Sequence, residues 1–271
     1  MLASTSAEQP WVGQPLAGRM AVVTGASTGI GRAIACELAA AGANVMVHAG
    51  QRRNAAEETA AAVVARGRQS WVLMADLGEV TEQDRLVEEA WKLGSRIDIW
   101  INNAGADVLT GVAAGWDFEA KLERLWRVDV VATMRLSRQV GQRMIADRER
   151  ANGLLPSIMT VGWDQAERGM EGDSGEMFAA TKGAIMAFTR SLAKSLAPHV
   201  RVNCLAPGWI RTAWGESTTS YWHQRACREA LLGRWGSPED VARVATFLAS
   251  PASAFITGHI LPINGGSGSH G

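Results

Sequence analysis

A glycine-rich segment near the start of the chain carries the first residues that could do chemistry. It reads TGASTGIG over residues 24–31, directly after a short apolar run and at the start of a helical pattern. Gly25, Gly29 and Gly31 would let the backbone turn tightly and approach a pyrophosphate, and the first N–H groups of the helix would face that anion. The segment therefore predicts a dinucleotide-binding turn.

Three further segments stand at the ends of later apolar runs. Asp76-Leu77 follows the third run, Asn102-Asn103-Ala104-Gly105 closes the fourth, and Pro207–Thr212 follows the sixth. The carboxyl ends of parallel strands meet at one edge of a sheet, so we expect all these segments to line one cleft. In that cleft the carboxylate of Asp76 could accept a hydrogen bond from an adenine amino group.

Seven short apolar runs, bounded by Gly or Asn, predict the strands that position these segments. They are Met20–Thr24, Asn44–His48, Ser70–Met74, Ile97–Asn102, Ser157–Val161, Val200–Leu205 and Ile260–Ile263. Helical patterns alternate with them, which predicts an α/β fold of the Rossmann type, with a doubly wound, seven-stranded parallel sheet and helices on both faces. We expect a single domain over residues 19–271, preceded by a flexible arm over residues 1–18 that is rich in Ser, Gln, Gly and Pro.

The composition narrows the class of partner. The chain has 27 Lys plus Arg and 27 Asp plus Glu, so no basic field favours nucleic acid or an anionic membrane. It shows neither a signal-peptide pattern nor an apolar stretch of membrane-spanning length, and its three cysteines lack metal-ligand spacing. We expect a cytoplasmic protein with a small-molecule substrate and no bound metal.

These segments, in this order and with these gaps, resemble the short-chain dehydrogenase/reductase family over residues 19–266. The resemblance implies an NAD(P)(H)-dependent oxidoreductase that forms a homodimer or homotetramer, with a substrate lid around residues 207–232. It also implies that the nucleotide lies near Gly25, Ser27, Gly29, Ile30, Gly31, Asp76, Leu77, Asn103, Ala104, Gly105, Lys182, Pro207, Gly208, Ile210 and Thr212.

Cofactor choice depends on the end of the second apolar run. A carboxylate there would hold the ribose hydroxyls of NAD(H), but residues 48–53 read HAGQRR and contain no acid. Arg52 or Arg53 could pair with a 2′-phosphate, so NADP(H) is favoured over NAD(H). Thr28 stands where NADP(H)-using relatives often carry a basic residue, which makes this preference modest.

The catalytic positions depart from the family pattern. Members usually carry an Asn, a Ser, and a Tyr and Lys four residues apart, in which the Tyr transfers the proton. Aligned on these motifs, Asp129 replaces the Asn, Trp163 the Ser and Phe178 the Tyr, while Lys182 is retained. A phenyl ring cannot transfer a proton, so the resemblance implies a rebuilt catalytic site. Tyr221, the one tyrosine of the chain, lies in the expected lid and is an alternative proton carrier.

The residues around this site favour a particular substrate class. Trp163, Trp209, Trp214 and Trp222 fall on the expected substrate loops and lid, beside carboxylates of the segment Asp164–Glu176. Rings and carboxylates together suit an organic cation. The leading hypothesis is an NADP(H)-dependent reductase of an imine or iminium, which needs no Tyr acid. A non-redox lyase or isomerase and a catalytically silent nucleotide-binding or regulatory protein remain as alternatives.

Overall fold

The computed structural model describes residues 13–147 and 154–266. Seven parallel strands form one sheet in the order β3-β2-β1-β4-β5-β6-β7, so the predicted sheet is confirmed. The strands are β1 (Met20–Val23), β2 (Asn44–Ala49), β3 (Ser70–Met74), β4 (Ile99–Asn102), β5 (Ser157–Val161), β6 (Arg201–Pro207) and β7 (Ile260–Ile263). The strand order reverses direction between β1 and β4, which is where such sheets open a crevice for ligands.

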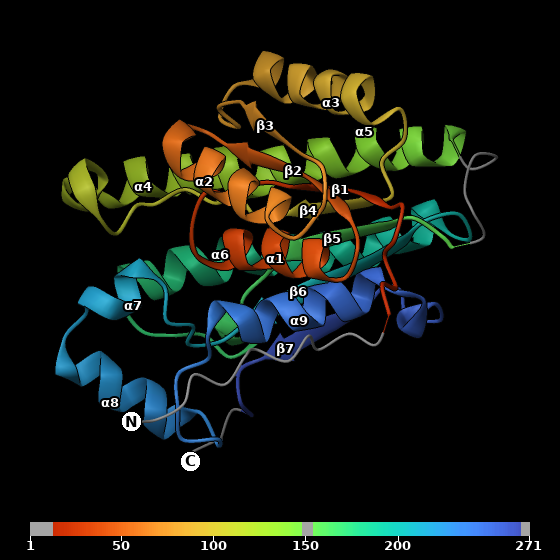
Figure 1. The fold of residues 1–271 in the computed structure, drawn as a ribbon. Helices are drawn as coiled ribbons and strands as arrows, with labels where there is room; N and C mark the ends of the chain where they lie inside the picture. The colour runs from red at the N-terminus through yellow and green to blue at the C-terminus, as the bar shows by residue number, and fades with distance from the viewer. Residues whose placement is uncertain (1–12, 148–153, 267–271) are drawn as a thin grey trace.

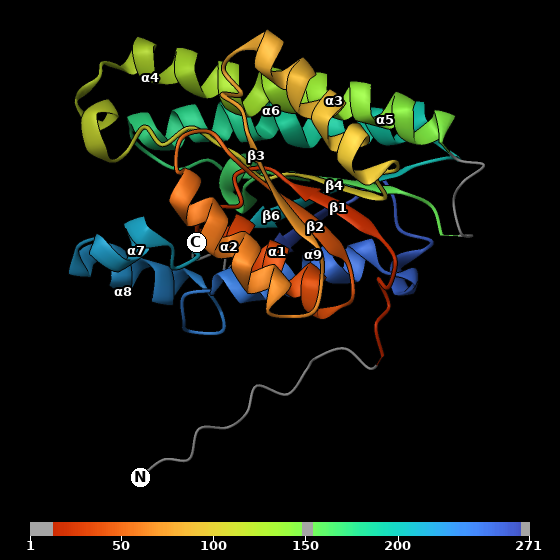
Figure 2. The same cartoon turned by 45° about the horizontal axis from the view of Figure 1, so that its top comes forward.

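Two layers of helices enclose the sheet, as Figure 2 shows edge-on. One layer contains α1 (Gly29–Ala40), α2 (Arg53–Val64) and α9 (Pro238–Ala249). The other contains α3 (Val80–Gly94), α4 (Phe118–Leu125), α5 (Ala132–Ala146) and α6 (Asp173–Leu196). The predicted Rossmann-type fold with helices on both faces is therefore confirmed.

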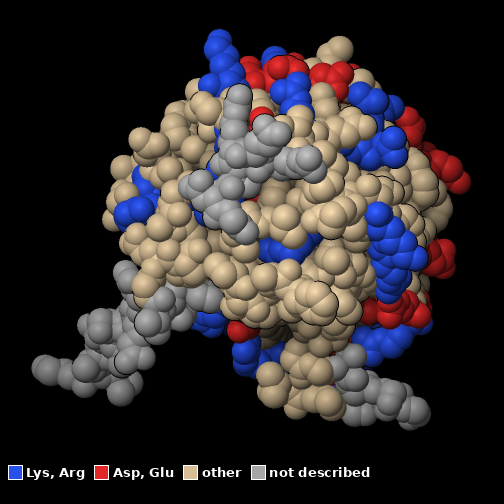
Figure 3. All heavy atoms as spheres, turned by 90° about the vertical axis from the view of Figure 1, so that its right-hand side faces the viewer, with Lys and Arg blue, Asp and Glu red and all other residues tan. Residues whose placement is uncertain are grey.

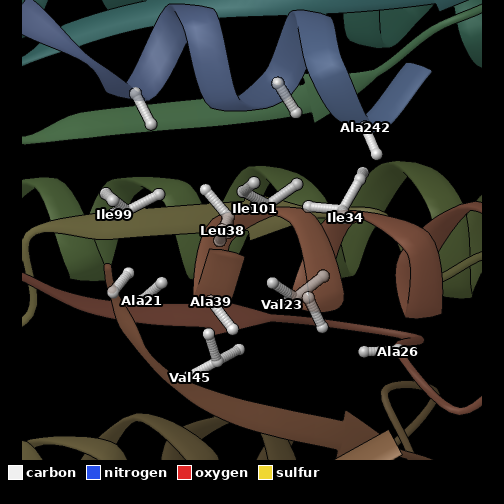
Figure 4. Close-up of a cluster of buried hydrophobic side chains, with 14 of the residues drawn as sticks. Ala21, Val23, Ala26, Ile34, Leu38, Ala39, Val45, Ile99, Ile101 and Ala242 are labelled. Carbon is white, nitrogen blue, oxygen red and sulfur yellow. The ribbon is translucent and has the colours of Figure 1, made fainter. Parts of the chain in front are cut away.

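Small apolar residues let the first layer pack closely on the sheet. Ile34 and Leu38 of α1 lie between Val23 of β1 and Ala242 of α9, all fully buried (Figure 4). Burial of each large aliphatic side chain contributes about 1.5–3 kcal/mol relative to exposure. This packing fixes the start of α1 directly beyond the end of β1.

A buried polar chain anchors the end of β4 in the second layer. The Trp100 indole N–H donates to Asn102 Oδ1 at 3.0 Å, and Asn102 Nδ2 donates to Ser137 Oγ of α5 at 2.9 Å. Because buried polar groups are costly unless paired, this chain holds β4 in one position against α5. The residues that follow Asn102 are positioned accordingly.

The helical segment over residues 118–146 is interrupted. The α4 helix, capped by the Asp117 carboxylate on Ala120 N, passes into a π-helical turn, η2 (Trp126–Val131), before α5 begins. A π-helical turn holds an extra residue and is frequent at functional sites. Within this turn Asp129 is 1% exposed and faces the interior of the protein.

The chain ends differ in part from the predictions. Residues 1–12 of the predicted arm lie outside the described residues, but Leu16 is fully buried and its N–H donates to Ala41 O at 2.9 Å. The folded domain therefore begins before residue 19. In the region of the predicted lid, α7 (Ala213–Ser217) and α8 (Ser220–Glu229) lie at the same end of the molecule as α4 (Figures 1 and 2).

The surface shows no field of a single sign on the face seen in Figure 3, where basic and acidic side chains neighbour each other around the rim. Within residues 13–147 and 154–266, no helix combines the length and the apolar character that crossing a bilayer requires.

Candidate active site

The glycine-rich turn has the shape that its sequence predicts. Gly25 and Gly29 adopt φ values of +63° and +55°, a region that favours glycine. A Cβ atom at Gly31 would lie 2.3 Å from the carbonyl oxygen of Gly25 and 2.5 Å from Asn103 Nδ2. The turn is therefore packed so closely around Gly31 that no side chain fits there.

Hydrogen bonds lock this turn to the end of β4. The Thr24 hydroxyl accepts from the backbone N–H groups of Asn103 and Ala104, each at 3.0 Å. Asn103 Nδ2 donates in return to the carbonyls of Thr24 at 2.9 Å and Gly25 at 3.1 Å. Two of the predicted cofactor segments are thereby held together at the carboxyl edge of the sheet.

The segment after β6 meets the same turn. Thr212, the first residue before α7, lies against Gly29, because a Cβ there would be 3.6 Å from Thr212 Cγ2. Gly208 N–H donates to Ile263 O at 3.0 Å, and Ile210 forms a bridge with Gly236. The segment Pro207–Thr212 is thus fixed between β7 and the glycine-rich turn.

The residues predicted to bind the adenosine end lie after β2 and β3. The Asp76 side chain is 43% exposed, and its Oδ1 accepts from Gly78 N at 2.8 Å and Arg124 Nη2 at 3.3 Å. Leu77 is buried beside it. Arg52 and Arg53 are both exposed at the start of α2, where Arg53 pairs with Glu57 at 3.5 Å.

Ser27 and Ile30 complete the predicted cofactor set. Ser27 is buried, and its carbonyl accepts from the Thr59 hydroxyl of α2 at 3.3 Å. Ile30 is partly buried and packs against the core cluster beneath α1. These contacts fix the middle of the turn and its continuation into the helix.

An ion pair occupies the interior of the catalytic region. Lys182 Nζ lies 2.8 Å from Asp129 Oδ2, and the two side chains are 14% and 2% exposed. Asp129 Oδ1 accepts from Ala106 N at 2.7 Å, and a Cβ at Gly105 would lie 3.0 Å from Asp129 Oδ2. Asp129 thus ties α6 to the loop after β4, a connection that the sequence did not reveal.

Two aromatic rings lie at predicted catalytic positions. Trp163, just after β5, and Phe178, on the first turns of α6, contact edge to face with ring centroids 6.4 Å apart. Phe178 packs with Met177 and Leu125 in a small apolar cluster of the α4 side. Neither ring offers a proton-transferring group, and Lys182 is one helical turn further along α6.

The predicted cation site is not assembled as expected, because arginines already pair the loop carboxylates. Around η4 (Asp164–Glu167), Arg168 contacts Asp164 at 3.3 Å and Arg190 contacts Glu167 at 3.1 Å. Further along, Arg225 of α8 binds Glu171. Three of the acids expected beside a substrate cation thus already have arginine partners.

The tryptophans of the lid region form a cluster of their own. Trp209 lies 5.6 Å from Trp222 and 5.9 Å from Trp235 between ring centroids, and its indole N–H donates to Glu229 at 2.8 Å. Tyr221 is 56% exposed, with its ring edge-on to Trp222 at 5.1 Å. The side chain of Trp214 lies outside the described part of the structure.

Two buried titratable side chains lie near the site, and one of them, His48, was not singled out from the sequence. His48 lies beneath the glycine-rich turn, and Asp164 accepts from Asn264 Nδ2 at 3.0 Å. Burial raises the pKa of Asp164, although the bonds from Asn264 and the charge of Arg168 oppose this. The pairing of the strands was needed to find His48, because a lone histidine within an apolar run carries no local signal.

A doubly wound parallel sheet with a glycine-rich turn after its first strand defines the Rossmann-type class of nucleotide-binding proteins. A family model described as enoyl-(acyl carrier protein) reductase matches residues 25–268. The chain belongs to the short-chain dehydrogenase/reductase family, whose members are NAD(P)(H)-dependent oxidoreductases.

Individual relatives match over nearly their full length. The 3-oxoacyl-acyl-carrier-protein reductase of Aquifex aeolicus is 35% identical over 262 residues, covering 93% of this chain and 98% of that protein. A 7α-hydroxysteroid dehydrogenase solved with NADH and a 7-oxo bile acid superposes with a TM-score of 0.83 at 29% identity, covering 93% and 95%. A short-chain dehydrogenase from Burkholderia cenocepacia solved with NADP gives 0.81 at 28% identity, covering 93% and 98%.

Proposed function

We propose that this chain is an NADP(H)-dependent reductase of a small substrate that accepts hydride without a tyrosine acid, an imine or iminium being preferred. The observation that carries the proposal is the pairing at the catalytic position. Phe178 is the residue that the sequence aligns with the family's proton donor, and Lys182, one turn further along α6, is bound to Asp129. The nucleotide-binding turn, in contrast, keeps its closed shape.

The residues at the carboxyl edge of the sheet fit a dinucleotide. Glycine at position 31 lets the backbone of the turn pack closely, and the first N–H groups of α1 lack partners within the helix. Asn103 and Thr212 would flank the bound group, and Asp76 would reach its adenine end. When bound, the reduced nicotinamide supplies a hydride.

The protein groups at the reacting end would bind and orient rather than donate a proton. Trp163 and Phe178 present ring faces and edges, and the Lys182–Asp129 pair carries no net charge. Hydride addition to an iminium carbon sends the C=N π electrons to nitrogen and yields a neutral amine. No alkoxide forms, so the loss of the tyrosine is tolerated.

Cation binding in this proposal rests on the rings. Because the loop carboxylates are paired with arginines, the attraction for an iminium would come from Trp163 and Phe178, at about 0.5–2 kcal/mol for each cation–ring contact. For the cofactor, Arg52 at the start of α2 is the candidate partner of a 2′-phosphate, which favours NADP(H).

A panel of cyclic and arylalkyl imines with shape-matched ketones tests the proposal, with NADPH consumption followed at several pH values. Rates that follow the protonated fraction of the imine would support it, and Trp163→Ala should raise KM for cationic substrates more than for neutral ones. Tight nucleotide binding without NADPH consumption on either class would instead favour the non-redox or regulatory alternatives.

A second candidate is ordinary carbonyl reduction, which the named activities of the relatives favour. In that case the Lys182 ammonium is the remaining proton donor beside the reacting carbonyl. Faster turnover of the ketones than of the imines, lost in Lys182→Met, would select this candidate. We further propose a homodimer or homotetramer built through α4–α5 and α6, which size-exclusion chromatography with light scattering tests.

A further inference from the structure

One histidine contacts two neighbouring loops at the cofactor-binding edge of the sheet. His48, the last residue but one of β2, is 1% exposed and lies beneath the glycine-rich turn. Its Nδ1 is 3.2 Å from Gly25 N, and its Nε2 is 3.0 Å from Ala75 O, one residue before Asp76. The imidazole therefore bridges the turn after β1 and the end of β3.

These two contacts define a single tautomer. A carbonyl oxygen can only accept, so Nε2 carries the hydrogen that is donated to Ala75, and Nδ1 is left as the acceptor for Gly25 N–H. Burial outweighs the opposing effects of the Ala75 carbonyl and the Asp76 charge and lowers the pKa of His48 to about 4. The ring is thus neutral at neutral pH.

The backbone of His48 holds the next residue of the turn. Its carbonyl accepts from Ala26 N at 2.8 Å, so the N–H groups of both Gly25 and Ala26 point at His48. Gly25 is the residue of the turn with φ of +63°, and a Cβ there would be 2.7 Å from Ala104 Cα. The N–H groups left to face an anion are those at the start of α1.

We propose that His48 is a positioning residue for the dinucleotide: its Nδ1 acceptor fixes Gly25, and through Gly25 the whole phosphate-binding turn, in the conformation that receives the pyrophosphate. This inference rests on the proposed function, because it presumes that the turn binds a dinucleotide. His48 itself touches no part of the ligand in this scheme.

Two near-isosteric variants separate the two contacts. In His48→Asn the side-chain Oδ1 takes the place of Nδ1 and can still accept from Gly25, whereas in His48→Gln the side-chain Nε2 takes the place of the ring Nε2 and can still donate to Ala75. NADP⁺ binding is measured by tryptophan fluorescence at neutral pH. We expect a Kd within about threefold of wild type for His48→Asn and a rise of about tenfold for His48→Gln.

A control variant distinguishes a positioning role of His48 from a general loss of stability. Met144→Ala removes a buried side chain of α5 on the other face of the sheet and should lower stability while leaving Kd unchanged. In the wild type, imidazole ¹⁵N NMR should show a proton on Nε2 and a bare Nδ1, and the Gly25 amide should exchange faster in His48→Gln than in His48→Asn.

The possible results are separable. Equal Kd values for the Asn and Gln variants, or a proton on Nδ1 in the wild type, would overturn the role of His48 while leaving the proposed function intact. A wild-type protein that binds neither NADP⁺ nor NAD⁺ would overturn the proposed function and this inference with it.

Discussion

Lys182 of α6 and Asp129 of the η2 turn form a buried ion pair, with Nζ and Oδ2 2.8 Å apart. Two of the positions at which this chain was compared with the family pattern are therefore coupled physically. The lysine that the sequence predicts to be the retained catalytic residue has as its partner the residue predicted at the asparagine position.

Breaking this pair should destabilise the fold. Asp129→Asn keeps an acceptor for Ala106 N–H but leaves a buried ammonium without its counter-charge, and Lys182→Met leaves a buried carboxylate. Each single variant should lose about 3 kcal/mol of unfolding free energy, whereas the double variant should lose less than the sum. Urea unfolding of the four proteins gives the cycle. Strictly additive losses would contradict the pairing.

Two glycines of the turn should respond differently to alanine. Gly31→Ala places a Cβ 2.3 Å from the Gly25 carbonyl oxygen, so the turn must shift and the Kd for NADPH should rise more than about tenfold. In Gly29→Ala the Cβ makes only ordinary van der Waals contact with Thr212 Cγ2 at 3.6 Å, so the variant carries only the cost of its positive φ, about 1–2 kcal/mol. Fluorescence titration compares them. A smaller rise of Kd in Gly31→Ala than in Gly29→Ala would contradict the close packing of the turn around Gly31.

A carboxylate at the end of β2 should change cofactor preference. Gly50 does not have positive φ, and a Cβ there meets only Ala75 O at 3.7 Å, so Gly50→Asp fits without strain. The new carboxylate should repel a 2′-phosphate and accept from ribose hydroxyls. We expect the ratio of the NADPH Kd to the NADH Kd to rise at least about tenfold. Gly50→Asn is the uncharged control, and an equal change in both variants would exclude an electrostatic cause.

Acid should weaken the fold through His48. Its pKa is lowered from 6.5 to about 4, so the unfolded chain takes up a proton that the folded chain refuses. This difference has no effect on the unfolding free energy above about pH 6.5. It lowers that free energy progressively as the pH falls, and the loss reaches its full size of about 3 kcal/mol below about pH 4. Urea unfolding between these pH values should show a shallower dependence in His48→Asn, and parallel curves for the two proteins would contradict this assignment.

The sheet could be predicted closely because parallel strands buried on both faces are continuous apolar runs, as in Val45–Val47. The cofactor edge followed from topology, because glycines and asparagines stand where those runs end. The partners of the loop carboxylates could not be predicted. Glu171 lies in the loop before α6, whereas Arg225, which binds it, lies on α8. Nothing local in either segment indicates the contact.

The η2 turn has a consequence for chain length. A π-helical turn contains one residue more than an α-helical turn would need, so the segment between α4 and α5 holds one extra residue. Deleting Val130 would let the helix run on as regular α-helix, with α4 and α5 still in register, and would move the residues of the wide turn around the helix axis. Asp129 would then turn away from Lys182. The number of residues in this helical segment, and not only their side chains, therefore decides whether Asp129 and Lys182 meet.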